Sequence, residues 1–192
     1  MTNKIFAFVG PHGSGKTMLI GQLIAMGIHY VPTYTTRPKT AVNSNELFYR
    51  FVSKEDFFKM EFIVHVTYKG HYYGLRKKDV LGTLKTHKVS AVMLDASGVK
   101  QLAKILRGNF ESIFLMVDYV TLVDRMIRMG YKNDEIKYHL EYAESNNEFD
   151  NWKVCDHVIK NIHTPNTALN QAMAIMGLMR LPKVAMLRKL VG

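Results

Sequence analysis

The sequence predicts an α/β fold in which a central parallel sheet is covered by helices on both faces. Two features of the 192-residue chain indicate this fold: short apolar segments alternate with helical patterns, and a glycine-rich loop, "GPHGSGKT", directly follows the first apolar segment. A third feature, an aromatic-rich stretch between about 33 and 87, interrupts the alternation and indicates a small inserted lobe. A chain of this length is typical of one domain.

Four apolar segments account for the expected sheet. Continuous apolar runs are typical of strands that are buried on both faces, as in parallel sheets. Each run is followed by a helical pattern, which supplies the crossover that parallel strands need. We expect strands at 4–9, 89–95, 112–117 and 155–160, and helices near 16–26, 98–106, 119–128 and 165–180.

The inserted lobe is expected to be mixed and partly antiparallel. Its segments "FYRFVS" and "FIVHVTYKGHYYG" alternate roughly by two, which is the period of a strand. Between them, Ser53 followed by Asp56 indicates the start of a short helix. We therefore divide a single domain, 1–192, into a core of 1–32 and 88–192 and a lobe of 33–87.

Two further segments each allow two structural interpretations. The polar stretch 128–147, with Gly130 as a candidate hinge, is either a solvated helix pair or a mobile lid at about 126–140. The tail "MGLMRLPKVAMLRKLVG" combines methionine and leucine with basic residues. We expect the tail to pack on the core or to form a contact between two copies, rather than to lie on a membrane surface.

Composition narrows the environment and the partners. The single cysteine, Cys155, excludes an internal disulfide and favours the reducing cytoplasm. No apolar run has the length of a membrane span, and we expect the N-terminal segment to be a strand rather than a signal peptide. The formal net charge of +10 fits nucleic acid or anionic small molecules. Because no nucleic-acid motif is present, we favour small molecules, bound by a monomer or a homodimer.

The glycine-rich loop predicts a site for a nucleoside triphosphate. Gly10, Gly15, Lys16 and Thr17 match the pattern GxxxxGK[ST] between a strand and a helix, a context that disfavours a plain glycine turn. Glycines let backbone N–H groups converge on phosphate oxygens, at the positive end of the following helix. Lys16 would contact the β- and γ-phosphates, and Thr17 would bind Mg²⁺ with ATP. The residues expected to bind ATP are Gly10, His12, Gly13, Ser14, Gly15, Lys16, Thr17 and Met18.

A second cluster of candidate phosphate ligands follows in the inserted lobe. In "TYTTRPK", Arg37 could hold a phosphate by two parallel hydrogen bonds, with Lys39 assisting. Tyr49 and Tyr73 lie further along, in "FYRF" and "HYYG". A buried tyrosine more often packs than binds a ligand, so these two become candidates only in combination with the other motifs.

Taken together, the motifs resemble those of the guanylate kinase family, in order and near the family's spacing, from about residue 4 to residue 161. The family's GPSGSGK[ST], TTR, DYxFVSxxEF, FIE, YYG and LDID.QG correspond here to "GPHGSGKT", "TTRP", "FYRFVSKEDF", "FIV", "YYG" and "LDASG". Its arginine-bearing lid corresponds to "DRMIRMG". The resemblance implies a P-loop kinase fold with a helical lid, and the transfer of a phosphoryl group from MgATP to GMP, giving ADP and GDP.

The residues that bind the acceptor's phosphate in the family are largely matched in this chain. Arg37, Tyr49 and Tyr73 match family residues that bind the acceptor's phosphate, and Lys39 stands for a second arginine after a deletion of one residue.

The residues that bind the guanine base in the family are mostly replaced in this chain. Thr33 and Asp95 remain at the base end of the site. The other guanine-binding positions, a glutamate, a serine or threonine, and an aspartate, are replaced by Val64, Leu75 and Met93. The acceptor is therefore expected to be a phosphomonoester that is not read through the usual guanine contacts.

The lid also departs from the family. Arg125 matches its first arginine and Arg128 lies near the second, whereas the arginine of the following helix is replaced by His139. This replacement weakens one of the electrostatic clamps on the transferring phosphoryl group. The candidate catalytic residues are Lys16, Arg37, Asp95, Arg125 and Arg128.

Two alternatives to a guanylate kinase remain open at this point. One is a kinase for a non-guanine nucleotide or for ribose 1,5-bisphosphate, since the shortened spacing after Arg37 is similar to that of the ribose 1,5-bisphosphate phosphokinases. The other is a catalytically weak binding module; scaffold domains of this fold typically lose the phosphate loop, so an intact Lys16 and Thr17 argue against it. Asp95 could also serve only as a helix N-cap.

Overall fold

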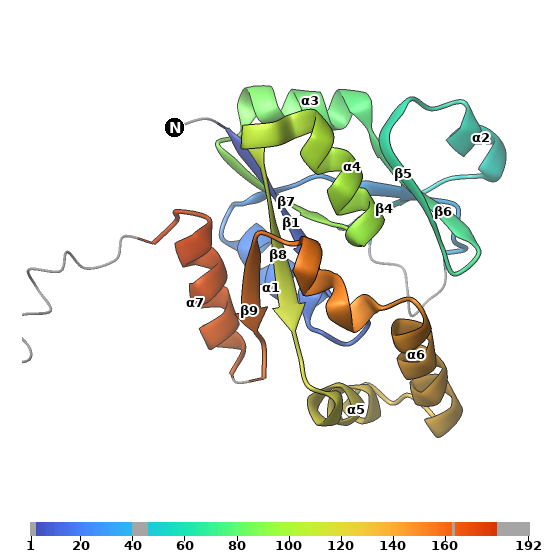
Figure 1. Ribbon diagram of the computed structural model, residues 1–192. Coiled ribbons are helices and arrows are strands. Elements are labelled where there is room, and N and C mark those ends of the chain that lie inside the picture. Colours follow the sequence, from blue (N-terminus) through green and yellow to red (C-terminus); the bar gives the residue numbers. More distant parts are fainter. Residues whose placement is uncertain (1–2, 40–45, 163, 180–192) are drawn as a thin grey trace, which may run out of the picture.

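The computed structural model has the expected α/β architecture (Figure 1). It describes residues 3–39, 46–162 and 164–179. The central sheet has five parallel strands in the order β2-β7-β1-β8-β9. Their bounds are Lys4–Val9 (β1), His29–Tyr30 (β2), Val89–Met93 (β7), Phe110–Met116 (β8) and His157–Lys160 (β9).

Helices cover both faces of this sheet because successive residues of β1 point to opposite sides. On one face, Phe6 and Phe8 pack with α1 (Lys16–Ala25) and α7 (Pro165–Ile175). On the other face, Ile5, Ala7 and Val9 pack with α3 (Lys77–Thr86) and α4 (Ala96–Leu106). A short 3-10 helix, η1 (Arg107–Asn109), leads from α4 into β8. The predicted fold class is confirmed.

A second sheet of four strands has the order β4-β3-β6-β5 and is mixed, since β3 and β4 are parallel and the other pairs antiparallel. Its strands are Thr33–Thr35 (β3), Tyr49–Phe51 (β4), Phe62–Tyr68 (β5) and His71–Arg76 (β6). The helix α2 (Lys54–Phe58) starts as expected, with the Ser53 hydroxyl accepting a hydrogen bond from the backbone N–H of Asp56 at 3.0 Å. Val64 of this sheet shares one apolar cluster with β1, so the two sheets meet in a continuous core.

Two helices, α5 (Tyr119–Arg128) and α6 (Asn133–Ser145), form a pair below the central sheet in the view of Figure 1. The chain reverses between them at Gly130, whose φ of 82° is readily adopted only by glycine. Leu122, Met126 and Ile136 pack between the two helices. A 3-10 helix, η2 (Glu148–Val154), then returns the chain to β9.

Several element boundaries differ from the expected ones, and the short edge strand β2 was not predicted. β7 ends at Met93 rather than 95, and β8 covers Phe110–Met116 rather than 112–117. α4 begins at Ala96 rather than near 98, because Asp95 is its N-cap. β9 begins at His157 rather than 155, because the Asp156 carboxylate accepts hydrogen bonds from the backbone and side chain of Ser112. α7 ends at Ile175, since Gly177 takes a left-handed φ of 69°.

The C-terminal residues 180–192, for which packing on the core or a contact between copies was expected, lie outside the described residues. Among the residues that the structure does describe, no helix has both the length and the apolar character needed to cross a membrane.

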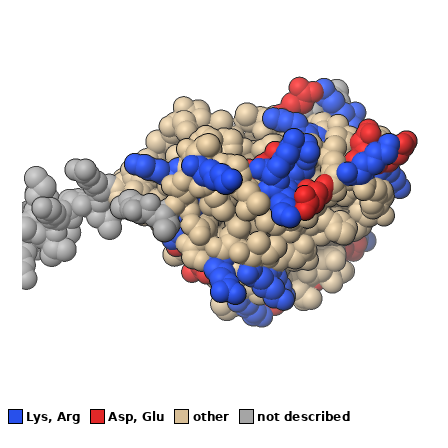
Figure 2. All heavy atoms as spheres, turned by 90° about the horizontal axis from the view of Figure 1, so that it is seen from above, with Lys and Arg blue, Asp and Glu red and all other residues tan. Residues whose placement is uncertain are grey.

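Figure 2 shows one face of the molecule, on which Lys and Arg form separate groups, several of them beside Asp or Glu. On this face a nucleic-acid backbone would find no continuous basic track along which to bind.

The packing of α4 gives a test of the core. Leu102 is fully buried between α4 and the sheet, whereas Ile105 on the same helix is 52% exposed. We expect Leu102→Ala to lower the free energy of unfolding by about 2–5 kcal/mol, because it leaves a cavity. Ile105→Ala should change it by less than about 1 kcal/mol. Equal losses for the two variants in urea unfolding would contradict this packing.

Candidate active site

A cleft of about 770 Å³ joins the glycine-rich loop to the second sheet. Its walls also include the carboxyl end of β7, the C-terminal part of α5 and the start of η2. The cleft brings together most of the site residues predicted from the sequence. Those that line it are Gly10, His12, Gly13, Gly15, Lys16, Thr17, Met18, Thr33, Arg37, Tyr49, Tyr73, Asp95, Arg125 and Arg128.

Two glycines of the loop are required by close packing. A Cβ atom on Gly10 would lie 2.9 Å from the backbone oxygen of Leu115, and one on Gly15 would lie 2.6 Å from the side-chain nitrogen of Asn161. Both glycines also have positive φ angles, 151° and 94°. The loop therefore folds tightly against the ends of β8 and β9, which fixes the direction of its backbone N–H groups.

The side chain of Lys16 folds back over this loop. Its ammonium donates hydrogen bonds to the backbone oxygens of Gly10 (2.6 Å) and Pro11 (2.9 Å) and to the buried Ser14 hydroxyl (3.3 Å). Burial lowers the pKa of Lys16 to about 8, and the charge of Glu148 acts in the opposite direction. An anion that replaced these oxygens would therefore meet a partly desolvated cation, which strengthens their attraction.

Arg125 and Asn161 hold the loop in place through hydrogen bonds to its backbone oxygens. Arg125 donates to the backbone oxygens of Gly13 (3.4 Å), Ser14 (3.2 Å) and Asn161 (2.7 Å). The buried Asn161 side chain donates to the same Ser14 oxygen at 2.8 Å. Asn161 was not predicted as a site residue; its only sequence signal is that it directly follows an apolar strand. Arg128, in contrast, is exposed and pairs with Asp124 at 2.9 Å.

The predicted phosphate ligands of the second sheet lie together. The Arg37 guanidinium is 5.0 Å from the centre of the Tyr49 ring, and the Tyr49 and Tyr73 rings are 6.3 Å apart, edge to face. Within the described residues, the buried Nε of Arg37 has no hydrogen-bond partner. A buried donor without a partner is costly, and a bound anion would satisfy it. Lys39 does not line the cleft; it pairs with Glu46 instead.

The far end of the cleft is apolar. Val64 and Leu75 face each other across β5 and β6 and are both almost fully buried. Met93 at the end of β7 lines the same region. Thr33 also lines the cleft, with its buried hydroxyl beside that of Tyr30.

Two carboxylates line the cleft. Asp95 is the N-cap of α4, with its Oδ1 accepting from the backbone N–H of Gly98 at 2.7 Å, and it lines the cleft as well. Burial raises the pKa of Asp95. Glu148, which sequence reasoning missed, also lines the cleft; burial raises its pKa, against the effect of the Lys16 charge. No motif identifies Glu148, because η2 brings it to the cleft only in the folded chain.

His12 connects the loop with the helix pair. Its ring stacks on that of His139 with 4.0 Å between the centres, and its Nε2 lies 3.0 Å from the Tyr131 hydroxyl. Burial, together with the charges of His139, Lys16 and other neighbours, lowers the pKa of His12 to about 3. The ring is therefore neutral at physiological pH in the free protein.

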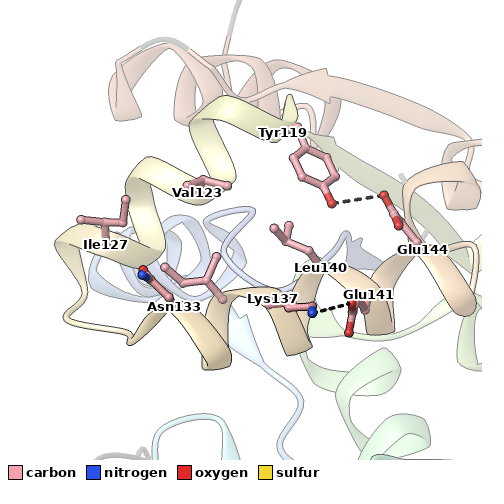
Figure 3. A pocket seen from close by; sticks show the side chains of 9 residues that line it. Tyr119, Val123, Ile127, Asn133, Lys137, Leu140, Glu141 and Glu144 are labelled. Carbon is pink, nitrogen blue, oxygen red and sulfur yellow. Dashed lines mark hydrogen bonds and ion pairs between the residues drawn. The ribbon is translucent and has the colours of Figure 1, made fainter.

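A second, smaller cavity of about 400 Å³ lies between α5 and α6 (Figure 3). Val123, Ile127 and Leu140 form its apolar part, and Tyr119 donates to Glu144 at its rim over 3.1 Å. Its one lysine, Lys137, pairs with Glu141 at 3.8 Å. None of the predicted site residues lines this cavity.

Comparisons with known proteins agree on one family. The family model described as guanylate kinase matches residues 2–176. The guanylate kinase of Bartonella henselae is 29% identical over 177 residues, covering 89% of this chain and 77% of the relative. That of Aster yellows witches'-broom phytoplasma is 30% identical over 167 residues, covering 83% and 79%.

A solved structure supports the fold. The crystal structure of guanylate kinase from Anaplasma phagocytophilum superposes with a TM-score of 0.67 at 20% sequence identity. The similarity covers 95% of this chain and 88% of that one.

The buried Lys16 predicts a pH dependence of stability. Its folded pKa of about 8 lies below its usual value of 10.5, so the burial penalty is present in full below pH 8. Between pH 8 and 10.5 the unfolded chain holds more protons than the folded one, and the penalty disappears as the pH rises. Wild type should therefore gain stability relative to Lys16→Met across this interval.

The measurement is urea unfolding of both proteins at several pH values from 7 to 10.5, with the exposed Lys78→Met as the control. A difference between wild type and Lys16→Met that stays constant across this interval would contradict the buried, charged state of Lys16.

Proposed function

The chain belongs to the guanylate kinase family, and from this premise we propose that it transfers the γ-phosphoryl group of ATP to GMP, giving ADP and GDP. Proteins of this family are nucleoside monophosphate kinases, so the chain is a phosphotransferase. The observation that carries the proposal is that one cleft contains both the glycine-rich loop and an arginine whose buried Nε has no partner among the described residues. We also propose that the enzyme works in the cytoplasm, which suits its one free cysteine.

The donor nucleotide is assigned to the glycine-rich loop. The backbone N–H groups between Gly10 and Thr17 would surround the β- and γ-phosphates, and Lys16 would exchange its bonds to Gly10 and Pro11 for phosphate oxygens. Arg125 holds the loop in shape through Ser14, so its contribution begins before the nucleotide arrives.

The oxygen donors of the cleft fit Mg²⁺. In the described part of the chain no three His, Cys, Asp or Glu side chains gather into a metal site. Mg²⁺ commonly takes few protein ligands and completes its shell with phosphate oxygens and water. The Thr17 hydroxyl, with the Asp95 and Glu148 carboxylates nearby in the cleft, is a donor set of that kind. The ion would neutralise charge on the phosphates.

The acceptor is assigned to the second sheet. Arg37 would bind its phosphate through two nitrogens, and Tyr49 and Tyr73 would donate hydroxyl hydrogen bonds to the same group. An oxygen of this phosphate attacks the γ-phosphorus of ATP. The bond from phosphorus to the β–γ bridging oxygen breaks, and ADP leaves with the electron pair. Because the protein forms no covalent bond, its contribution is to position the two phosphates and to offset their charge.

The base end of the acceptor site contributes little guanine recognition. Val64 and Leu75 offer only apolar contact, which does not distinguish one base's hydrogen-bond pattern from another's. Thr33 and Asp95 are the polar groups left to read the base. We therefore propose that GMP is accepted with weak preference over other nucleoside monophosphates. Because the relatives compared above are named guanylate kinases, we favour GMP over a sugar phosphate as the acceptor.

The first test concerns the acceptor's phosphate. Arg37→Ala should raise the KM for GMP by about 10- to 100-fold, since hydrogen bonds to a charged group contribute about 1.5–3 kcal/mol. The KM for ATP should change by less than about threefold, because the two phosphates are bound by separate elements. The exposed Arg50→Ala, in the same sheet, is the matched control and should behave as wild type. An equal rise in both KM values would show that Arg37 is misassigned.

The second test concerns the base. Val64→Glu should raise kcat/KM for GMP relative to that for AMP by about tenfold or more, since a carboxylate accepts hydrogen bonds from guanine and repels the acceptor face of adenine. Val64→Leu, which stays apolar, should leave the ratio unchanged. Because a buried carboxylate could prevent folding, Leu75→Ser serves as a second variant expected to shift the ratio in the same direction. A ratio that neither Val64→Glu nor Leu75→Ser alters would remove Val64 and Leu75 from the base site.

A further inference from the structure

Lys69 occupies an aromatic cage formed by α6, the second helix of the α5–α6 pair that contains the expected lid; α6 is called the lid helix below. Its ammonium lies 2.9 Å from Nδ1 of His139, and 4.7 Å and 4.6 Å from the ring centres of Tyr138 and Tyr142. Lys69 belongs to the turn between β5 and β6, whose end lies above α6 in Figure 1. The contact therefore joins the second sheet, which carries the predicted acceptor site, to the helix pair.

The backbone at this turn is unusual for a lysine. Lys69 has a φ of 49° and Gly70 a φ of 77°, so the two-residue turn has both central residues in the left-handed region. Such turns strongly prefer Asn-Gly or Gly-Gly. A lysine held in this conformation by its surroundings points to a role for its side chain.

The cage is connected to the glycine-rich loop through His139. His139, which contacts Lys69, stacks directly on His12 of the glycine-rich loop. The charges of both Lys16 and Lys69 act on His12 and on Glu148, so the two ammonium groups share these two neighbours.

The lid helix has no lysine or arginine of its own beside His139. Between Asn133 and Ser145 the chain has one lysine, Lys137, and no arginine. Lys137 lines the other cavity, where it pairs with Glu141 (Figure 3). The positive charge beside position 139 therefore comes from Lys69.

We propose that Lys69 supplies, from the second sheet, the positive charge that the lid helix lacks at His139, and that it supports phosphoryl transfer in this way. The inference rests on the proposed function. When acceptor and ATP are both bound, the γ-phosphoryl group passes from the bridging oxygen of ATP to an oxygen of the acceptor phosphate, as described above. Lys69 takes no part in bond making; its charge offsets the negative charge that the two nucleotides bring together. Because the acceptor sheet carries it, this charge reaches the lid only when sheet and lid are in contact.

The proposal is tested by moving the charge from one element to the other. Lys69→Asn removes the charge and creates Asn-Gly, which suits the turn, so the fold should be kept. We expect its kcat to fall by about tenfold or more, with the KM for ATP within about threefold of wild type. Lys69→Arg should retain most of the activity. The exposed Lys78→Asn, on α3, is the control and should match wild type.

The decisive variant is His139→Arg, made in two backgrounds. In the Lys69→Asn protein it should restore kcat by about fivefold or more, since it returns a cation to the same place. In the wild-type background it should lower kcat, because two cations would compete for one cage. An effect of His139→Arg that is the same in both backgrounds, or a Lys69→Asn protein as active as wild type, would overturn the proposal. A wild-type protein that transfers no phosphate to any nucleoside monophosphate would overturn the proposed function itself, and with it this inference.

Discussion

The backbone oxygen of Ser14 is the point on which the site depends, because two distant parts of the chain bind it at once. Asn161, directly after β9, donates to it at 2.8 Å, and Arg125 from α5 donates at 3.2 Å while also binding the Asn161 backbone. β9 lies at the edge of the parallel sheet, beside β8. This strand order brings the Asn161 side chain and the Arg125 guanidinium to the same backbone oxygen of the loop. The loop's N–H groups are thereby directed before any ligand binds, and binding costs less conformational entropy.

Two cations of the cleft, Lys16 and Arg37, form no ion pair with a carboxylate in the part of the chain that the structure describes. Lys16 is bonded to neutral oxygens, and Arg37 leaves a buried Nε without a partner among the described residues. Burial moves the pKa of Lys16 down and that of Glu148 up, so each of these groups is less stable in its charged form than it would be in water. The triphosphate of ATP, the phosphate of the acceptor and a divalent cation would satisfy these groups together. A site of this kind sacrifices some stability of the free protein for preorganised charge, as is common for active sites.

The sequence predicted the features that local rules decide and missed those that depend on tertiary contact. The strands, the N-cap at Ser53 and the glycine-rich loop follow from periodicity, capping and backbone freedom, and each was found. Asn161, Glu148 and Lys69 carry no motif. Strand order brings Asn161 to the glycine-rich loop, a 3-10 helix brings Glu148 to the cleft, and a hairpin turn brings Lys69 to α6; no local pattern encodes these contacts. Lys39, expected to assist the acceptor's phosphate, pairs with Glu46 outside the cleft, because the spacing of a motif fixes the position of a backbone but not the direction of a long side chain.

The most direct test of the account follows the phosphoryl group itself. Wild-type protein would be incubated with Mg²⁺, GMP and ATP labelled in its γ-phosphate, and the products would be separated by ion-exchange chromatography. We predict that the label appears in the β-phosphate of GDP, in step with the formation of ADP, and that little of it is released as inorganic phosphate. Label that remains in ATP, or that appears only as inorganic phosphate, would contradict a cleft built to join two nucleotides.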